Sequence, residues 1–184
     1  MIIMINGAFG SGKTTVAELL NNRIPNSMIY DPEEIGFMLR NIISDDIKSE
    51  SEKTDNFQDI MLWKELVVDV GNRLRKAYGK SLIVPMTICD RDRFLSIKDG
   101  LLKADNVITF WLNAKRKTLE NRLSKRGDGV GSWPYIQIDL CEKFIETNSD
   151  LFDYIIATDD LSASCVAESI VKCVIIRKHN NGTK

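Results

Sequence analysis

The feature that most constrains the fold is a glycine-rich segment near the start of the chain. Residues 7–14 read Gly-Ala-Phe-Gly-Ser-Gly-Lys-Thr and fit the pattern G-x-x-x-x-G-K-[ST]. They follow the apolar run Ile2 to Ile5 and precede Val16 to Leu20, whose apolar residues recur with helical spacing. The sequence therefore predicts strand, turn and helix in that order, with an ordinary glycine turn as the alternative.

This arrangement suits the binding of phosphate groups. Glycines let consecutive backbone N–H groups converge on phosphate oxygens, and the following helix directs the positive end of its dipole to the same place. Lys13 would reach the β- and γ-phosphates of ATP, and the Thr14 hydroxyl would ligate Mg²⁺. Thr15 is included among the predicted cofactor-binding residues, although we expect its side chain to lie on the helix surface or to pack against neighbouring residues. The predicted cofactor-binding residues here are Gly7, Ala8, Phe9, Gly10, Ser11, Gly12, Lys13, Thr14 and Thr15.

Short apolar runs alternate with amphipathic stretches along the rest of the chain. Near-continuous apolar runs are typical of parallel strands that are covered on both faces. Alternating strands and helices imply right-handed crossovers and an α/β fold with an open sheet, whose ligands gather at the carboxyl ends of the strands. From a length of 184 residues we expect a single domain over residues 1–184. The predicted strands after the first are Ser27 to Tyr30, Ser81 to Thr87, Asn106 to Leu112 and Asp153 to Thr158.

Helical periodicity and polar segments divide the remaining chain. Apolar residues between Phe57 and Tyr78 recur at i, i+3, i+4 and i+7, which predicts one long helix with a buried face. The segments Ser44 to Asn56 and Gly127 to Gly131 lack an apolar period, so we expect mobile surface segments there. The last helix is expected from about Ala163 to Ile176, before a polar tail, Arg177 to Lys184, that frays.

Composition narrows the classes of function. Lys and Arg number 25 against 26 Asp and Glu, so the formal net charge is -1 and no global positive field recruits nucleic acid or an anionic membrane. No apolar run approaches the roughly 20 residues needed to span a bilayer, and the first residues lack the features of a signal peptide. We expect a cytoplasmic protein without an integral membrane segment or a nucleic-acid partner. The four cysteines lie far apart and are interpreted as packing residues, which argues against a zinc site.

The segment Asp31-Pro32-Glu33-Glu34 follows the second predicted strand. Asp31 is a good N-cap, Pro32 suits the first helical position, and Glu34 would close a capping box. A carboxylate at the carboxyl end of a strand, beside a phosphate loop, would also accept the proton of an attacking hydroxyl, as phosphotransfer requires. The two roles are compatible, so the sequence leaves open whether Asp31 is a base or only a helix cap.

The end of the third predicted strand departs from a common pattern. Many nucleotide hydrolases carry an aspartate there that holds magnesium through water, whereas this chain reads Val84-Pro85-Met86-Thr87. Asp90 follows shortly afterwards and either replaces that aspartate or begins a solvated helix. Arg40, on the helix after Asp31, faces either substrate or solvent.

Two arginines are candidates for binding the transferred phosphate. A helix from about Lys115 places Arg122 and Arg126 on one face, where like charges repel by a few tenths of a kcal/mol. An anion bound between the two arginines would replace their repulsion by a net attraction, because the guanidinium group is well shaped to bind phosphate oxygens. The alternative is pairing with nearby acids such as Asp128 or Glu142. The glycines that follow would let the arginines swing over a triphosphate as a lid.

Several segments together resemble a known family. They are Ile5 to Thr14, Tyr30 to Phe37, Leu82 to Thr87, Ser132-Trp133 and Thr158 to Ser162. In these segments, and in order over roughly residues 2 to 170, the chain resembles the bacterial tunicamycin-resistance ATP-binding protein family. More distantly it is similar to nucleoside monophosphate kinases, shikimate kinase and chloramphenicol phosphotransferase.

The resemblance implies a P-loop three-layer sandwich with a five-stranded parallel sheet of order 2-3-1-4-5. It also implies a substrate-binding helical region at about residues 32–78 and a lid region at about residues 115–149. The loop that contains Asp159 and Leu161 would line the adenine pocket, and Asp31 would be the base by similarity to antibiotic phosphotransferases. Nucleoside monophosphate kinases carry Asp-Gly and nearby arginines after the third strand, and their absence here argues against a nucleoside monophosphate acceptor.

We therefore expect a transferase that uses ATP and Mg²⁺ to phosphorylate a hydroxyl of a small molecule, such as tunicamycin or another nucleoside-like antibiotic. The alternative is an ATP-gated protein that gives resistance by sequestering the drug without chemistry. A regulatory ATPase ranks last, because no residue is evident that would position water.

These hypotheses share one set of candidate residues. Trp133 either closes on a substrate or packs in the core, and the chain is expected to act as a monomer or homodimer. The predicted catalytic residues are Lys13, Asp31, Arg122 and Arg126, and the predicted substrate-binding residues are Asp31, Phe37, Arg40, Trp63, Met86 and Trp133.

Overall fold

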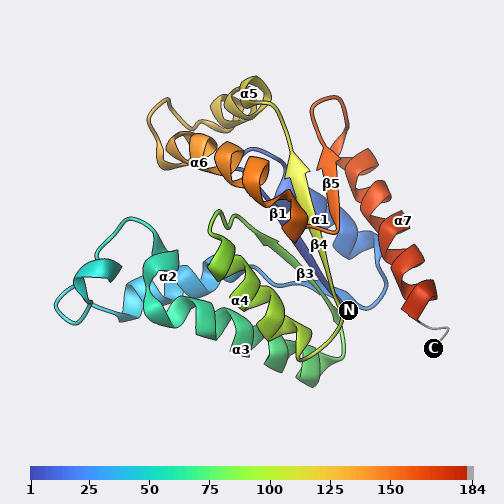
Figure 1. Ribbon diagram of the computed structural model, residues 1–184, viewed down its shortest axis with the longest axis horizontal. Helices are drawn as coiled ribbons and strands as arrows, with labels where there is room; N and C mark the ends of the chain where they lie inside the picture. Colours follow the sequence, from blue (N-terminus) through green and yellow to red (C-terminus); the bar gives the residue numbers. More distant parts are fainter. Residues whose placement is uncertain (182–184) are drawn as a thin grey trace.

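The chain folds around a five-stranded parallel sheet with helices on both faces (Figure 1). The computed structural model describes residues 1–181. The strand order is β2-β3-β1-β4-β5, which confirms the predicted order and the α/β class. The strands are β1 (Ile2–Gly7), β2 (Ser27–Ile29), β3 (Ser81–Met86), β4 (Val107–Asn113) and β5 (Tyr154–Ala157).

Helices follow the strands and form the two outer layers. The α-helices are α1 (Lys13–Arg23), α2 (Pro32–Ile42), α3 (Met61–Tyr78), α4 (Arg91–Leu102), α5 (Arg116–Arg126), α6 (Trp133–Asn148) and α7 (Ala163–Asn181). Three short 3₁₀ turns are η1 (Glu50–Glu52), η2 (Phe57–Asp59) and η3 (Ser149–Leu151). Figure 1 shows α1 and α7 on one side of the sheet and α3 and α4 on the other.

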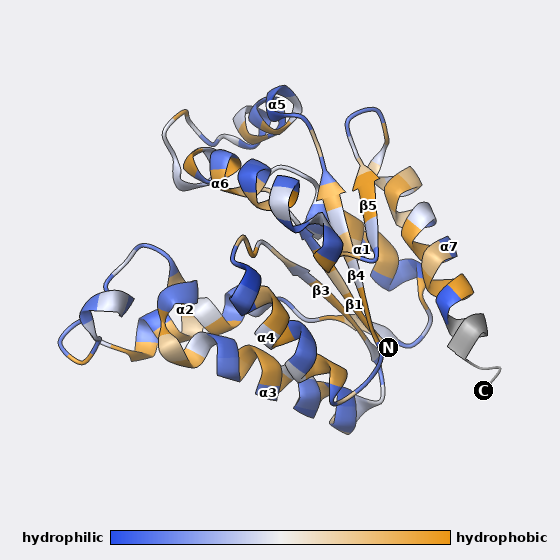
Figure 2. Ribbon diagram, viewed as in Figure 1, coloured by the Kyte–Doolittle hydropathy of each residue, from blue (hydrophilic) through white to orange (hydrophobic). Residues whose placement is uncertain are grey.

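The central strand β1 explains why the sheet is buried on both faces. Its residues alternate between the two layers, because successive side chains of a strand point to opposite faces. Ile3 and Ile5 belong to the cluster that includes residues of α1 and α7. Ile2 and Met4 belong to the larger cluster on the opposite face, which includes residues of α3, α4 and α6. The strands are accordingly mostly apolar, whereas the helices are apolar mainly on one side (Figure 2).

The structure corrects two predicted helix boundaries. The predicted helix Phe57 to Tyr78 is divided, because Asn56 caps the turn η2 and the extended backbone of Ile60 separates that turn from α3. The last helix continues to Asn181 instead of ending near Ile176, so the first part of the expected tail is helical. The rest of that expectation, over residues 182–184, lies outside the described residues.

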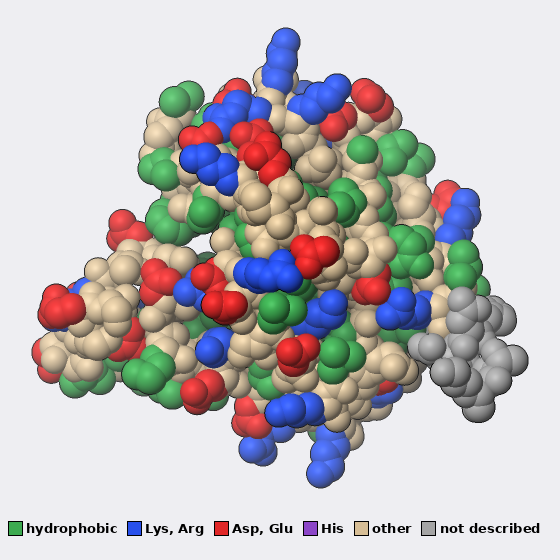
Figure 3. Space-filling view, viewed as in Figure 1, with side chains coloured by type: hydrophobic (Ala, Val, Ile, Leu, Met, Phe, Trp, Pro, Cys, Tyr) green, Lys and Arg blue, Asp and Glu red, His purple; other side chains and the backbone are tan. Residues whose placement is uncertain are grey.

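Among residues 1–181, none of the helices combines the length and the apolar character that crossing a bilayer requires. Acidic and basic side chains are interspersed on the face drawn in Figure 3.

The contact between α3 and α4 allows a test of the packing. Gly100 is buried, and a Cβ placed on it would lie 2.6 Å from Cγ1 of Val68. We predict that Gly100→Ala lowers the free energy of unfolding by about 1–3 kcal/mol, although alanine is the better helix former. Ser96→Ala, at an exposed position of the same helix, should change it by less than about 0.5 kcal/mol in a denaturant titration. A Gly100→Ala protein as stable as the Ser96→Ala protein would contradict the observed packing.

Candidate active site

The glycine-rich segment Gly7–Thr14, here called the phosphate loop, joins the central strand β1 to helix α1. Gly10 and Gly12 adopt left-handed backbone conformations, with φ of 81° and 97°, which glycine tolerates better than other residues. Gly12 immediately precedes α1, and no side chain among the described residues caps that end of the helix. The first amide groups of α1 therefore remain available to an anion.

Close packing explains the first two glycines of the loop. A Cβ on Gly7 would lie 2.7 Å from the carbonyl oxygen of Leu112 and 2.8 Å from Oγ of Ser11. A Cβ on Gly10 would lie 3.1 Å from the carbonyl oxygen of Leu119. Side chains at these positions would push the loop away from β4 and α5.

A buried asparagine holds the loop in place. Asn6 is the last residue before the loop, and its Oδ1 accepts hydrogen bonds from the backbone N–H groups of Gly7 and Ile88, each at 2.9 Å. Its Nδ2 donates to the carbonyl oxygen of Ile88 at 2.8 Å. The Thr87 hydroxyl donates to the carbonyl oxygen of Gly7 at 3.1 Å. The start of the phosphate loop is thus bonded directly to the segment that follows β3.

Lys13 and Ser11 give the loop its polar side chains. Nζ of Lys13 donates to the carbonyl oxygen of Ala8 at 2.9 Å and lies 5.5 Å from the centroid of the Phe9 ring. Burial lowers the pKa of Lys13 to about 8. The buried Oγ of Ser11 has no hydrogen-bond partner among residues 1–181. A buried hydroxyl without a partner is costly, and a phosphate oxygen would satisfy it.

The residues present fit a nucleotide triphosphate with Mg²⁺. The loop offers free helix amides, an unpartnered hydroxyl and a buried cation, all suited to phosphate oxygens. The side chains of Thr14 and Thr15 are exposed on the first turn of α1. Within residues 1–181 no cluster of three or more His, Cys, Asp or Glu side chains forms a metal cage. In such sites Mg²⁺ takes few protein ligands and completes its shell with phosphate and water oxygens, so the Thr14 hydroxyl suffices as a protein ligand.

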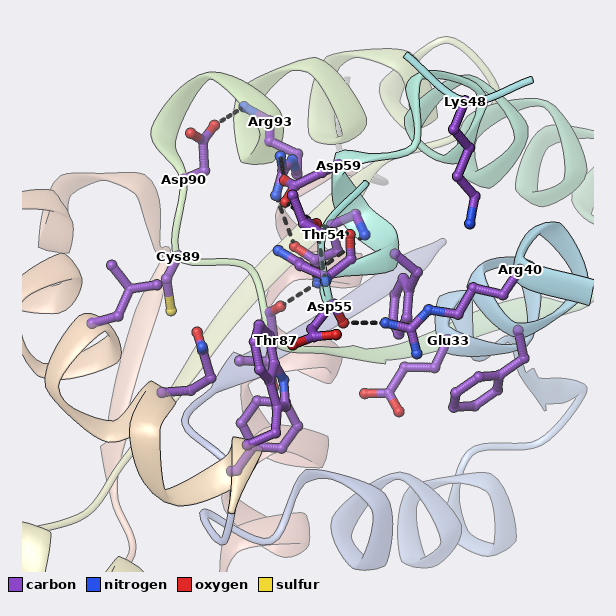
Figure 4. A pocket seen from close by; sticks show the side chains of 18 residues that line it. Glu33, Arg40, Lys48, Thr54, Asp55, Asp59, Thr87, Cys89, Asp90 and Arg93 are labelled. Atoms are coloured by element: carbon purple, nitrogen blue, oxygen red, sulfur yellow. Dashed lines mark hydrogen bonds and ion pairs between the residues drawn. The ribbon is translucent and has the colours of Figure 1, made fainter. Parts of the chain in front are cut away.

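A cavity of about 870 Å³, here called the acceptor cavity, lies next to the phosphate loop (Figure 4). Its volume is within the range of small-molecule sites. In the space-filling view an opening separates the α6 side of the molecule from the α2 side (Figure 3). The lining residues are Phe9, Glu33, Phe37, Arg40, Lys48, Thr54, Asp55, Asn56, Phe57, Gln58, Asp59, Thr87, Cys89, Asp90, Arg93, Trp133, Gln137 and Leu140.

Two carboxylates at the start of α2, Asp31 and Glu33, interact electrostatically with Lys13 of the phosphate loop. Asp31 caps the helix, because its Oδ1 accepts the N–H of Glu33 at 2.9 Å. The Glu33 carboxylate lines the cavity (Figure 4). Burial raises the pKa of both Asp31 and Glu33, and the charge of Lys13 partly offsets that rise. The expected capping box is not formed, since the Glu34 carboxylate makes no hydrogen bond in the described part of the chain.

The wall formed by η2, the segment after β3 and the start of α4 is a hydrogen-bonded polar network. Gln58 Nε2 donates to the carbonyl oxygen of Thr87 at 2.7 Å. The guanidinium of Arg93 donates to Gln58 Oε1 at 3.2 Å and to Asp59 Oδ1 at 2.9 Å. Asp90 caps α4 by accepting the N–H of Arg93 at 2.7 Å, which supports its interpretation as a helix start.

The three candidate arginines have different surroundings. Arg40 lines the acceptor cavity, donates to the carbonyl oxygen of Asp55 and lies 5.3 Å from the centroid of the Phe57 ring. Arg126 is exposed and pairs with Asp128 at 2.5 Å, as the alternative interpretation expected. Glu142, the other acid considered, instead pairs with Arg116 at 3.0 Å.

Arg122 joins the phosphate loop to the loop after β5. It donates to the carbonyl oxygen of Gly10 at 3.4 Å and to the Thr158 hydroxyl and carbonyl oxygen at 3.1 and 2.6 Å. Asp159, in the same loop, accepts from the Thr118 hydroxyl at 2.7 Å, and the Leu161 side chain is exposed. The segment expected to line an adenine pocket therefore borders the phosphate loop.

The structure brings some of the predicted substrate-binding residues to the cavity and not others. Phe37, Arg40 and Trp133 line it, and Trp133 is 40% exposed and so is not a core residue. Trp63 and Met86 do not line it, because they are 1% and 2% exposed. Trp63 is a core residue whose Nε1 donates to the carbonyl oxygen of Pro32, so its predicted contact with substrate is corrected.

Sequence reasoning missed three contributors to the site. Asn6 was hidden inside an apolar strand, although a lone amide there is itself a signal, because buried polar groups need partners. Glu33 was interpreted only as part of a helix start, yet its carboxylate lines the cavity. The hydrogen bond between Gln58 and Arg93 joins two segments 35 positions apart, and no short sequence pattern predicts such a contact.

The fold and the loop together define a class of protein. A parallel sheet of order 2-3-1-4-5, with G-x-x-x-x-G-K-T directly after its central strand, is the fold of the P-loop kinases. Residues 3–133 match the family described as AAA domain, and the chain belongs to that family. No curated protein sequence matches the chain significantly.

Solved structures with the same fold include resistance proteins and kinases. The tunicamycin resistance protein of Deinococcus radiodurans is 29% identical, with 94% of each chain covered and a TM-score of 0.73, which confirms the resemblance found in the sequence. A sugar kinase from Janibacter sp. HTCC2649 is 18% identical over 93% of this chain and 92% of its own, with a TM-score of 0.63. Shikimate kinase from Acinetobacter baumannii is 15% identical over 96% of this chain and 94% of its own, with a TM-score of 0.60. These two kinases share the fold.

The contacts of Arg122 lead to a prediction about local stability. Arg122→Gln removes charge-assisted hydrogen bonds between α5, the phosphate loop and the loop after β5, each worth about 1.5–3 kcal/mol. We expect backbone amides of residues 8–12 and 158–161 to exchange their hydrogens at least about tenfold faster, as measured by mass spectrometry.

Arg126→Gln is the matched control for this change. Arg126 lies on the same helix, and its side-chain hydrogen bond in the described part of the chain goes to Asp128 and to neither loop, so its loss should leave exchange in both loops unchanged. Equal exchange in the two variants would show that Arg122 does not hold the loops together.

Proposed function

We propose that the protein transfers the γ-phosphoryl group of ATP to a hydroxyl of a small molecule bound in the acceptor cavity. The observation that carries this proposal is that the carboxylates of Asp31 and Glu33 both interact with the charge of Lys13 in the phosphate loop, while Glu33 also lines the cavity. A cation for the phosphates and a carboxylate for the acceptor hydroxyl are what phosphotransfer needs at adjacent positions.

ATP would supply the phosphoryl group, and Mg²⁺ would neutralise charge on it. The chain's own residues bind and orient the phosphates. The free amides at the start of α1 and the Ser11 hydroxyl would donate hydrogen bonds to the phosphate oxygens, and the Thr14 hydroxyl would ligate the metal. Lys13 leaves the carbonyl oxygen of Ala8 to hold the β- and γ-phosphates.

The arginines and the lid would act on the same phosphates. Arg122 already lies between the phosphate loop and the segment of Asp159 and Leu161, where it would hold the nucleotide. Arg126 would have to exchange its Asp128 partner for a phosphate, which the left-handed Gly127 at the end of α5 permits. We propose residues 115–149 as the lid and residues 32–78 as the substrate-binding region of a single domain.

Asp31 is the proposed proton acceptor. Its Oδ1 is engaged in the cap of α2, which leaves Oδ2 for the acceptor hydroxyl. Glu33 lines the cavity and would bind and orient that hydroxyl. Burial destabilises both charged carboxylates and so makes them more basic, which favours the uptake of a proton from a hydroxyl.

The acceptor cavity would take a compound that has both flat rings and hydroxyl groups. Phe9, Phe37, Phe57 and Trp133 offer aromatic surfaces, and the Gln58 to Arg93 network offers donors and acceptors. We propose tunicamycin or another nucleoside-like antibiotic as the acceptor, in keeping with the tunicamycin resistance protein of similar structure. Sequestration without chemistry is the second candidate, because the engaged Oδ1 of Asp31 is also what a simple helix cap needs.

The direct test is to incubate the protein with ATP, Mg²⁺ and a panel of tunicamycin, nucleosides and other antibiotics, and to analyse the compounds by mass spectrometry. We expect one compound to gain a phosphoryl group. Lys13→Ala should lower turnover by orders of magnitude, because the phosphates lose their principal cation. Unmodified compound that is retained by the protein only with ATP would support sequestration instead.

Paired substitutions separate the roles of the two carboxylates. We predict that Asp31→Asn retains ATP binding and loses about 10²–10⁴-fold in kcat, the usual contribution of a general base. Glu33→Gln should raise KM for the acceptor more than it lowers kcat. If Asp31→Asn turns over normally, Asp31 is only a helix cap, and a large loss of kcat in Glu33→Gln would assign the proton to Glu33.

The lowered pKa of Lys13 predicts how ATP affinity depends on pH. Bound phosphates favour the charged lysine, so binding to the free protein takes up a proton once the pH exceeds about 8. Affinity should then fall by up to about tenfold per pH unit, as measured by calorimetry from pH ~6 to ~10. Lys13→Arg should bind with little pH dependence in this range, because its guanidinium does not titrate. A wild-type profile as flat as that of the variant would contradict the role of Lys13.

A further inference from the structure

Two cysteines that are far apart in the sequence meet beside the phosphate loop. Sγ of Cys89 donates to Sγ of Cys141 at 2.9 Å, across 52 positions of the chain. Cys89 lies in the segment between β3 and α4 and lines the acceptor cavity, as labelled in Figure 4. Cys141 lies in the middle of α6 and is 1% exposed. The pair therefore spans the contact between the central sheet and α6.

The surroundings distinguish this pair from the other two cysteines. Lys13 interacts electrostatically with both sulfurs. The hydrogen bond from Cys89, together with the charge of Lys13, lowers the pKa of Cys141, whereas the same hydrogen bond and burial raise the pKa of Cys89. Once the pair has lost one proton, the negative charge is on sulfur, and the two sulfurs share the remaining thiol proton in their hydrogen bond. Cys165 and Cys173 are both on α7, away from the cavity, and Cys165 is exposed.

We propose that Cys89 and Cys141 form a redox modification site, in which hydrogen peroxide closes an intramolecular disulfide that tethers α6 to the wall of the acceptor cavity. This goes beyond the proposed transferase activity and does not depend on it. A disulfide needs a distance of about 2.05 Å between the two sulfurs. A small shift of α6 toward the segment between β3 and α4 would shorten the present distance of 2.9 Å to that value.

The chemistry needs one peroxide for each disulfide. The shared proton passes to Cys141, and the Cys89 thiolate, which borders the cavity, attacks one peroxide oxygen. The O–O bond breaks, Cys89 becomes a sulfenic acid, and the departing hydroxide takes the proton of Cys141 to form water. The Cys141 thiolate then attacks the Cys89 sulfur and releases hydroxide. Counted from two neutral thiols, the sulfurs lose two electrons and two protons, and peroxide is reduced to two molecules of water.

The disulfide would change the mobility of one wall of the cavity. Trp133, Gln137 and Leu140 of α6 line the cavity, and α6 lies within the proposed lid region. A covalent link to the segment after β3 would restrict the movement of these side chains relative to the phosphate loop. A thiol reductant would reverse the effect, as expected for a regulatory disulfide in a reducing compartment.

The experiment treats the purified, fully reduced protein with hydrogen peroxide, alkylates the remaining thiols and maps the peptides by mass spectrometry. We expect a cross-linked peptide containing Cys89 and Cys141, which disappears after treatment with dithiothreitol. Hydrogen exchange of the same samples should be slower in α6 after oxidation than before. Neither readout requires phosphotransfer, so a failure of the proposed function leaves this test intact.

Variants provide the matched controls. Cys89→Ser and Cys141→Ser should each abolish the cross-link and the slower exchange, whereas Cys165→Ser should retain both. If Cys141→Ser does not fold, because its site is buried, Cys89→Ser alone carries the comparison. Further oxidation of Cys89 to the sulfinic acid without a cross-link, or disulfides between molecules through Cys165, would overturn the proposal. So would a cross-link that leaves exchange in α6 unchanged, because α6 would then not be tethered in any functional sense.

Discussion

The hydrogen bonds of one buried amide side chain position the whole site. Asn6 is the last residue but one of the central strand and bonds to both backbone groups of Ile88, while its Oδ1 also accepts the N–H of Gly7. The phosphate loop starts at Gly7, and the segment around Thr87 and Cys89 forms one wall of the acceptor cavity. Because the same side chain anchors both, the loop and the cavity are fixed relative to each other without any ligand. Preorganisation of this kind lets a site hold reacting groups at little further entropic cost.

Burial of charge is the second constraint on the site. Lys13 is withdrawn from water, which lowers its pKa, and the neighbouring carboxylates Asp31 and Glu33 are destabilised in their charged forms for the same reason. The charge of Lys13 favours the charged forms of both carboxylates, whereas the charges of the neighbouring carboxylates oppose them. The Nζ of Lys13 donates to the carbonyl oxygen of Ala8. Charged groups that are buried in this way beside a cavity are typical of functional sites. The charge of Lys13 also acts on the sulfurs of Cys89 and Cys141.

Much of the fold could be predicted because its signals are local. The apolar strands, the loop 7–14 and the strand order followed from periodicity, from one motif and from a family resemblance. The break between η2 and α3 could not be predicted, because Phe57 and Ile60 keep the helical spacing while Asn56 caps an earlier turn. Apolar spacing reports which residues are buried and does not report where the backbone leaves the helix.

The site could be predicted from the sequence at positions where a residue type has a single structural role in its motif. Lys13 and the glycines belong to a loop whose backbone geometry demands them, whereas Trp63 and Trp133 carry the same side chain and occupy a core and a cavity wall, respectively. Glu33 was hidden for a related reason, since an acidic residue in the first turn of a helix is expected there on electrostatic grounds alone. Arg93 was hidden because its partners, Gln58 and Asp59, lie more than 30 positions away in the chain. Only the tertiary structure shows that these side chains face one cavity.

The central claim is that the phosphate loop and the acceptor cavity form one site. A crystal structure of the protein with Mg²⁺ and a non-hydrolysable ATP analogue tests it most directly. The γ-phosphate should contact Lys13 and the start of α1, and it should face the cavity on the side of Asp31 and Glu33. A nucleotide bound elsewhere, or a γ-phosphate directed away from the cavity, would contradict the claim.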